Sequence, residues 1–527
     1  MVENSRASAP IATLSLISFI VGAGLVALPF SAFHMSIYLA IPYHIFNWSC
    51  AIYSIHLFLK CAEVTGQDSM ARIGCEVLGK FSLYLVNSLQ IVAFGILPVA
   101  YLIIMGQSLN SMLIIVSWVK HSCKGTLDKQ WFSVVAMALV LSPWVLKKKF
   151  EDLKIIGVLM FSTVILFTGF FFSLCMFFRS SWLDHYEEDE WNKFFKPSFD
   201  LKFYASLSTP LVAYGFQSAF FPVYNNLKEK NYSQGIITTI LAMSFCFLIY
   251  MMVIFASAHT FGEKVCGDVL QNLQKPKDDL YWQGIALKSF FIVILAGHFP
   301  YVFLVFKESL LAIVALIFIR GETQNITESA ESEEHFQNPH VRSRLVPTDR
   351  VQLLSAANEQ EYKEREFHTP ASKRRVHNEL TPNDESEIEI DQSRSFNTNY
   401  NLENNDLIQA LTLEDTNIET VSNSWRNRIY YCITIFMYLI IVLSACFIHN
   451  VEVVIRLAGS IGNPFLNFTF PGLFYFVIMR RHGVNNSWWQ LGLALALCIY
   501  GTMMGVILTI LNIWSSFEKT DENCMFS

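Results

Sequence analysis

The chain has 527 residues, of which 53% are hydrophobic and only 16% are charged, and its mean hydropathy is +0.37. Soluble domains carry about 25% charged residues, so this composition argues against a soluble multidomain enzyme. The formal net charge of −6 is small for this length and makes nucleic acid a poor candidate for a partner. The composition therefore predicts an integral membrane protein that crosses the lipid bilayer many times.

Apolar stretches long enough to span a bilayer recur along the chain. A spanning helix needs roughly 20 mostly apolar residues, and about eleven such stretches are present. We therefore expect an all-α membrane protein of about eleven transmembrane helices. The stretches are 11–33, 37–59, 82–117, 132–146, 155–178, 203–224, 235–260, 284–319, 428–449, 451–479 and 488–514.

One segment, 321–424, departs from this pattern. It is rich in Glu, Asn, Ser, Gln and Thr and has few apolar runs, so it cannot bury enough surface to fold by itself. We predict that it is a disordered loop, which divides the chain into helices 1–8 (residues 1–320), the loop (321–424) and helices 9–11 (residues 425–527).

Basic residues in the short loops give an orientation. Three groups (Lys147 to Lys149, Lys228 with Lys230, and Arg480 with Arg481) fall on one side if the N-terminus is cytosolic. The acidic run 187–190 then faces outward, while two basic pairs (Lys120 with Lys124, Lys275 with Lys277) contradict the pattern. The majority predicts a cytosolic N-terminus and a cytosolic 321–424 loop, and leaves the plasma membrane and a lysosomal or vacuolar membrane as alternatives.

The eleven cysteines show neither a C-x-x-C pattern nor metal-ligand spacing, so we expect no metal and no cofactor. Cys123 and Cys266 both fall in predicted outer loops. A disulfide between them is the less favoured of two interpretations, because their distance cannot be read from the sequence.

The first helix contains Gly22-Ala23-Gly24 with Pro29 five residues beyond. Small residues of this kind allow close helix packing. They also suit an unwound segment whose free N–H groups bind an anion. The first helix alone does not decide between these interpretations.

The sixth helix is also interrupted, at Pro210, Gly215 and Pro222. Helices 1 and 6 correspond if helices 1–5 and 6–10 form two repeats. Interruptions at matching positions of two repeats are the best sequence indication of a transporter binding site. The pair therefore favours the functional interpretation of both breaks.

Six segments in order resemble the amino acid/auxin permease family: VGAGLVALPFSAF, YLIIMGQSL, LSPWVLKKKFEDLKIIG, AYGFQSAFFPVYNNLKEK, VFLVFKESLL and LAGSIGNPFLNFTFPGLFYFVIM. The resemblance implies the inverted-repeat fold of the bacterial leucine transporter, with eleven helices and broken helices 1 and 6. It also implies an amino acid substrate held midway in the membrane.

By this resemblance, the backbone at Gly22, Ala23 and Gly24 would bind the substrate carboxylate. The substrate ammonium would meet backbone carbonyls of helix 6 near Tyr214, Gly215 and Phe216. Gln217, where many family members have His, completes the substrate-binding candidates. The chemistry agrees, because a half-helix N-terminus favours anions and freed carbonyls favour cations.

Two departures from the family bear on the coupling ion. Ser18 stands where sodium-coupled members often have Asn, and His298 stands two residues before Pro300, where they tend to have Thr or Ser. Imidazole is a poor sodium ligand, so the sequence disfavours sodium. His298 is the only His that we place deep in a span, and an intramembrane ionisable group suits proton coupling. The alternatives are a neutral His bonded to a helix carbonyl and a His at the outer mouth of the site.

The leading prediction is therefore a proton-coupled secondary transporter of amino acids that works by alternating access. A transporter of another small organic acid or amine on the same fold is the first alternative. An amino-acid-sensing receptor with little flux is the second. No H-E-x-x-H or G-x-S-x-G motif is present, which argues against an enzyme.

Overall fold

The computed structural model describes residues 8–115, 129–147, 154–177, 199–262, 265–273, 281–334, 420–448, 450–484 and 487–517. The chain divides into two compact units. The first contains residues 1–314 and 418–527, and the second contains residues 315–417. All of the residues that form the site below belong to the first unit.

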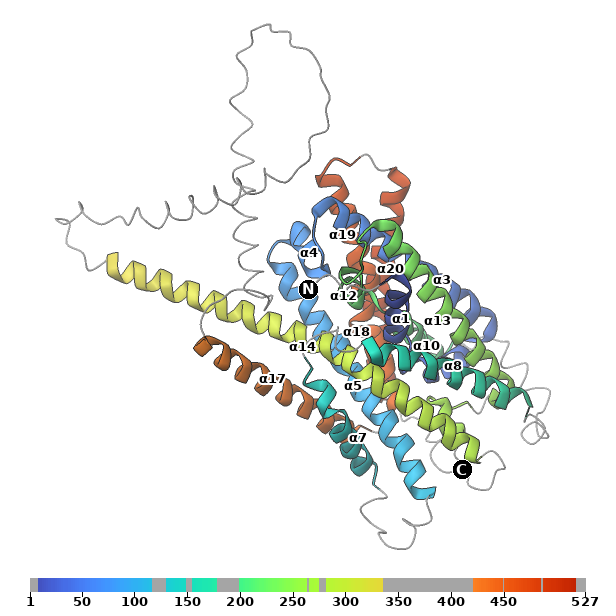
Figure 1. Cartoon of the computed structure of the whole chain (residues 1–527). Helices are drawn as coiled ribbons and strands as arrows, with labels where there is room; N and C mark the ends of the chain where they lie inside the picture. Colours follow the sequence, from blue (N-terminus) through green and yellow to red (C-terminus); the bar gives the residue numbers. More distant parts are fainter. Residues whose placement is uncertain are drawn as a thin grey trace, which may run out of the picture. The chain divides into compact units, whose positions relative to one another are not determined.

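The described residues are almost entirely helical, and none of them forms a β-strand (Figure 1). The α-helices are α1 (Ala9–Ile20), α2 (Gly24–Met35), α3 (Ile37–Thr65), α4 (Met70–Leu78), α5 (Phe81–Ile115), α7 (Gln130–Val145), α8 (Lys154–Phe177), α10 (Leu201–Ser206), α11 (Ser208–Ala213), α12 (Gln217–Asn225), α13 (Tyr232–Phe261), α14 (Tyr281–Glu334), α17 (Thr420–Phe447), α18 (Val451–Ile461), α19 (Phe470–Arg481) and α20 (Trp488–Phe517). A 3₁₀ helix, η4 (Val269–Leu273), and a π-helix, η6 (Phe465–Thr469), complete the set.

Seven helical segments of the described chain are long and apolar enough to cross a membrane, and the bent pair α1 and α2 makes an eighth. Each of the eleven stretches predicted from hydropathy coincides with a helix or a group of short helices. The stretches that fail the span criterion are α3, the short α7 and the interrupted group α10 to α12. The integral membrane class is confirmed, and the number of spans stays a prediction.

The first apolar stretch is divided where the sequence predicts a break. Helix α1 ends at Ile20, Val21 takes an extended conformation, and α2 begins at Gly24 with its axis turned by 58°. The sixth stretch is also interrupted, because α11 ends at Ala213 and α12 begins only at Gln217. Both breaks lie at the glycines of the two interrupted motifs.

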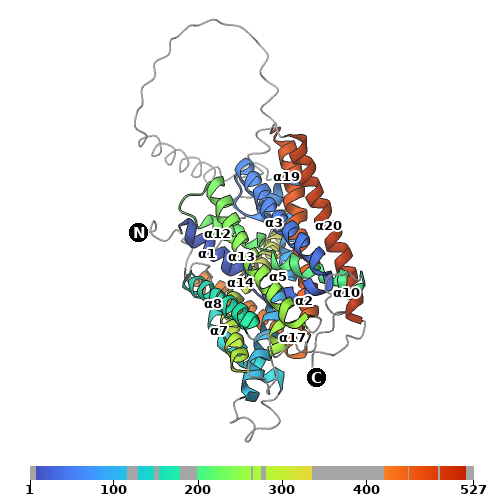
Figure 2. The ribbon, with the colours of Figure 1, turned by 90° about the vertical axis from the view of Figure 1, so that its right-hand side faces the viewer.

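The broken helices lie inside the bundle of the first unit. Helix α1 packs against α8, α12 and α13, and α2 packs against α11 and α13. Helix α5 packs against α7 and α18, while α19 packs against α3 and, side by side, against α20 (Figure 2). The two breaks are therefore surrounded by unbroken helices.

Several sequence predictions concern segments that the structure describes only in part. Helix α14 ends at Glu334 and α17 begins at Thr420, so the predicted 321–424 loop is helical at both ends. Residues 335–419 lie outside the described residues. Cys266 is disulfide-bonded, whereas Cys123, the partner considered from the sequence, lies outside the described residues.

Candidate functional site

A cavity lies between the two broken helices. One wall is the backbone of the breaks themselves, formed by Gly22, Ala23 and Gly24 from the first and by Ala213 and Gly215 from the second. Helix starts carry unsatisfied N–H groups and helix ends carry unsatisfied carbonyls. This wall therefore places backbone N–H groups at a helix start beside backbone carbonyls at a helix end.

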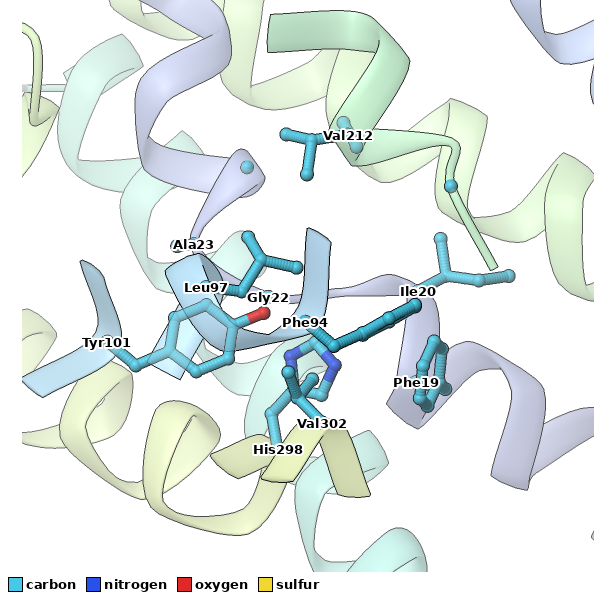
Figure 3. Close-up of a pocket in the computed structure, with 13 residues that line it drawn as sticks. Phe19, Ile20, Gly22, Ala23, Phe94, Leu97, Tyr101, Val212, His298 and Val302 are labelled. Carbon is cyan, nitrogen blue, oxygen red and sulfur yellow. The ribbon is translucent and has the colours of Figure 1, made fainter. Parts of the chain in front are cut away.

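The opposite wall consists of side chains from α1, α5 and α14. It is formed by Phe19 and Ile20 of α1, Phe94, Leu97 and Tyr101 of α5, and His298 and Val302 of α14 (Figure 3). Most of these are apolar, and the lining contains no Asp, Glu, Lys or Arg.

Gly22 is required by close contacts in this cavity. A Cβ atom added at Gly22 would overlap the ring of His298 and would lie 2.8 Å from the Tyr101 hydroxyl. Figure 3 shows both side chains directed at the segment that carries Gly22. At the other end of the break, a Cβ at Gly24 would lie 3.0 Å from the Cβ of Ala213. Small residues therefore bring the two breaks together.

His298 is a buried polar group that faces the cavity. It is 2% exposed, and its ring lies 5.7 Å from the ring of Phe19 and 5.2 Å from that of Tyr101. Neither ring nitrogen makes a hydrogen bond of good geometry among the described residues, although the Phe19 backbone lies close enough to interact with the ring. Buried polar groups normally have partners, so this imidazole is a candidate for contact with a bound molecule or for carrying a proton.

The predicted helix 6 residues separate into two groups. Gly215 lines the cavity, whereas Tyr214, Phe216 and Gln217 do not, although all three are fully buried. The Tyr214 hydroxyl lies 3.1 Å from His44 Nδ1. Gln217 stabilises the break, because its Oε1 accepts the Phe216 N–H at 2.9 Å and its Nε2 donates to Ser54 at 2.9 Å. Whether any of them contacts substrate stays a prediction.

Ser18 also lies outside the cavity lining. Its hydroxyl donates to the carbonyl of Gly157 on α8 at 2.9 Å. A Cβ at Gly157 would lie 3.4 Å from the Tyr301 hydroxyl and 3.6 Å from the Ser18 hydroxyl. Ser18 thus joins α1 to α8 close to Tyr301 of α14, which follows His298 by three residues. Its predicted part in ion coupling is not tested by this contact.

Two further buried residues lie behind the breaks and were not singled out from the sequence. His44 of α3 is 0% exposed, so His298 is not the only deeply buried histidine. Tyr250 of α13 is also 0% exposed, and its hydroxyl lies 3.0 Å from the Ile20 carbonyl and 3.1 Å from the Ala213 carbonyl. A lone polar group within an apolar span is the only sequence signal for either residue.

Charged side chains inside the bundle are paired or bonded away from the cavity. Arg456 Nε lies 3.3 Å from Glu452 on α18, as their i, i+4 spacing predicts. Lys307 on α14 donates to the carbonyl of Lys147 at 2.8 Å, beyond the C-terminal end of α7. Among the described residues no group of three His, Cys, Asp or Glu could hold a metal ion.

Comparison with known families identifies the chain. A family model described as transmembrane amino acid transporter protein matches residues 5–515. The chain belongs to this family. Members of the family are membrane transporters and not enzymes, which confirms the resemblance stated from the six segments.

Two solved structures were compared with this member of the transmembrane amino acid transporter family. Both are crystal structures of a manganese transporter from Eremococcus coleocola, one with an aromatic bis-isothiourea compound and one of a mutant. Each is 12% identical over 96% of this chain and 94% of the other, with TM-scores of 0.37 and 0.39. With TM-scores this low, the two structures give no information about the fold or the function of this chain. No curated protein matches the chain.

Proposed function

We propose that the chain is a secondary active transporter that carries amino acids across a membrane by alternating access. The observation that supports this most is the cavity between the two broken helices. The start of α2 faces it on one side, and the end of α11 lies within van der Waals reach of Gly24 on the other. The N-terminal end of α2 would bind the substrate carboxylate, and the carbonyl ends of α1 and α11 would bind the ammonium.

The coupling ion of the proposed transporter is a proton rather than sodium. His298 supports this, because it is buried at the cavity and neither of its ring nitrogens makes a hydrogen bond of good geometry among the described residues. Imidazole changes its charge within the physiological pH range, whereas sodium requires several oxygen ligands. Ser18, where sodium-coupled members often have Asn, supplies a single hydroxyl oxygen, whose hydrogen is donated to the Gly157 carbonyl.

The proposed architecture has eleven transmembrane helices as two inverted repeats of five helices plus one, with the N-terminus in the cytosol. The correspondence of the breaks at Gly22 and Gly215 supports the repeat. The basic residues Lys228, Lys230, Arg480 and Arg481 support the orientation. The 321–424 loop would then be cytosolic, and the plasma membrane and a lysosomal or vacuolar membrane remain the two proposed locations.

The test is uptake into liposomes that contain the purified chain. Each of the radiolabelled amino acids is supplied in turn under an inward proton gradient and then under an inward sodium gradient. We expect accumulation that the proton gradient drives and that dissipating it abolishes. Accumulation driven only by sodium would refute the coupling proposal and keep the transporter.

Two other outcomes correspond to the alternative functions. Accumulation of a small organic acid or amine, but of no amino acid, would replace the substrate proposal on the same site. Saturable amino acid binding without accumulation under either gradient would favour a sensing receptor. Liposomes without protein are the control for leakage in every case.

A further inference from the structure

The hydroxyl of Tyr250 is placed at the junction of both broken helices. Tyr250 belongs to α13, an unbroken helix that packs against α1 and α2. Its hydroxyl lies 3.0 Å from the Ile20 carbonyl and 3.1 Å from the Ala213 carbonyl. Ile20 is the last residue of α1, and Ala213 is the last residue of α11. One side chain therefore contacts the final carbonyl of both half-helices.

These two carbonyls form a point of concentrated negative potential. Each half-helix ends in unsatisfied carbonyls and carries about half a negative charge at its C-terminal end. Two such ends that meet inside an apolar bundle repel each other unless a donor lies between them. Ile20 and Ala213 are both among the residues that line the cavity, so both half-helix ends lie at its wall.

The Tyr250 phenol can satisfy only part of the hydrogen-bonding capacity of these two carbonyls. A hydroxyl has one hydrogen and can donate to one carbonyl at a time, whereas an ammonium group has three hydrogens and a full charge. The Tyr250 side chain is completely buried and is not among the residues that line the cavity. It can therefore hold the two half-helix ends together without filling the cavity, and a stronger donor in the cavity could take its place at the two carbonyls.

We propose that Tyr250 is a positioning residue that acts in place of the substrate ammonium when the site is empty. The phenol holds the ends of α1 and α11 together, and an arriving amino acid competes for the same two carbonyls. This inference rests on the proposed function. It explains how the two breaks can stay aligned during the return of the unloaded transporter.

The consequence is a selective defect in Tyr250→Phe. Net uptake requires the transporter to return empty, whereas exchange of internal for external amino acid requires it to return loaded. Loss of the phenol hydrogen leaves a buried carbonyl unsatisfied only when no substrate is bound. We expect net uptake, relative to exchange, to fall by about tenfold, from the usual penalty for one unsatisfied buried group.

The matched control is Tyr438→Phe. Tyr438 donates its phenol hydrogen to the Ala138 carbonyl at 2.6 Å, between α17 and α7, and does not line the cavity. The Tyr438→Phe substitution removes a phenol-to-carbonyl hydrogen bond of the same kind, at a place away from the two breaks. The ratio of net uptake to exchange should stay at the wild-type value in this variant.

Both fluxes are measured in liposomes with L-leucine as the first probe and then with the amino acid that the wild type accumulates best. A ratio of net uptake to exchange in Tyr250→Phe that equals the wild-type ratio would overturn the inference, whether or not both fluxes fall together. If the wild type shows neither flux with any amino acid, the proposed function fails and this inference with it. If the wild type shows both and only the ratio disagrees, the proposed function stands.

Thermal unfolding covers the case in which the variant folds poorly. Competition for the same carbonyls means that the probe should raise the unfolding temperature of Tyr250→Phe more than that of the wild type. A variant that folds only in saturating probe would be the extreme form of this result. A variant that is equally unstable with and without the probe would show a structural role unrelated to occupancy.

Discussion

The substitution Gly22→Ala tests the packing of the candidate site most sharply. The added methyl group would overlap the ring of His298 and approach the Tyr101 hydroxyl to 2.8 Å. The imidazole cannot move aside easily, because it lies between the rings of Phe19 and Tyr101, at centroid distances of 5.7 and 5.2 Å. Either the broken segment of helix 1 or the ring must therefore shift.

The expected magnitude follows from the energetics of overpacking. Forcing one extra methyl group into a packed interior costs about 1–3 kcal/mol. If this strain falls on the arrangement that binds substrate, amino acid affinity should drop by roughly 5- to 150-fold. The unfolding temperature should also fall. Binding of radiolabelled amino acid to purified protein and thermal unfolding in detergent measure the two effects.

Gly169→Ala is the matched control, because Gly169 lies within α8 and an added Cβ meets no atom within 4 Å. Alanine in a helix interior is more stable than glycine by about 0.5–1 kcal/mol, so this variant should unfold no earlier than the wild type. If Gly22→Ala behaves like Gly169→Ala in both assays, the cavity packing described here is wrong.

A double variant locates the strain. His298→Ala removes the ring that the Gly22→Ala methyl would overlap, so the two substitutions together should destabilise less than their separate effects predict. Residues in contact usually show a non-additive term of about 0.5–3 kcal/mol. Strict additivity of the unfolding free energies would mean that the two positions do not touch.

Three further predictions address coupling, a loop and a helix end. His298→Gln should flatten the pH dependence of uptake, and a profile unchanged from the wild type would exclude His298 as the coupling group. Burial raises the pKa of Asp268, which lies outside the spans, from 3.8 to about 6. Because the folded state holds this proton more tightly than the unfolded state, the Asp268 carboxyl contributes stability that is fully present below about pH 4 and is lost as the pH rises through 6. Asp268→Asn should therefore reduce the pH dependence of thermal unfolding between pH 4 and 7. An equally steep pH dependence in the variant would contradict this. Lys307→Met removes the donor to the carbonyls of Val145 and Lys147, and it should lower the unfolding free energy by roughly 1.5–3 kcal/mol. An unchanged unfolding free energy would mean that solvent or lipid satisfies these carbonyls instead.

The breaks in helices 1 and 6 could be predicted because their causes are local. The two half-helices can approach each other because Gly22, Gly24 and Gly215 have no side chains. The need for small residues at these positions is visible in the sequence itself. The apolar spans are equally local, since about 20 apolar residues suffice to span a bilayer. The family resemblance then added the expectation that the two breaks share one site.

The side-chain wall of the cavity could not be predicted in the same way. Helices α1, α5 and α14 are apolar around much of their circumference, so the sequence does not reveal that Phe94, Tyr101 and Val302 face inward. Tyr250 bonds carbonyls that are 230 and 37 residues away, which no local pattern records. The hydrogen bond from Ser18 to Gly157 on α8 also joins residues far apart in the sequence, and the part of Ser18 in ion coupling stays a prediction.

The central claim is that an amino acid binds between the breaks of helices 1 and 6, and photo-crosslinking tests it most directly. A diazirine analogue of leucine is bound to the purified chain, activated by light and located by mass spectrometry, with unlabelled leucine as competitor. We predict that unlabelled leucine suppresses labelling within residues 19–24, 94–101, 212–215 and 298–302, the segments that line the cavity. Competable labelling at other segments alone, or no competable labelling at all, would contradict the site described here.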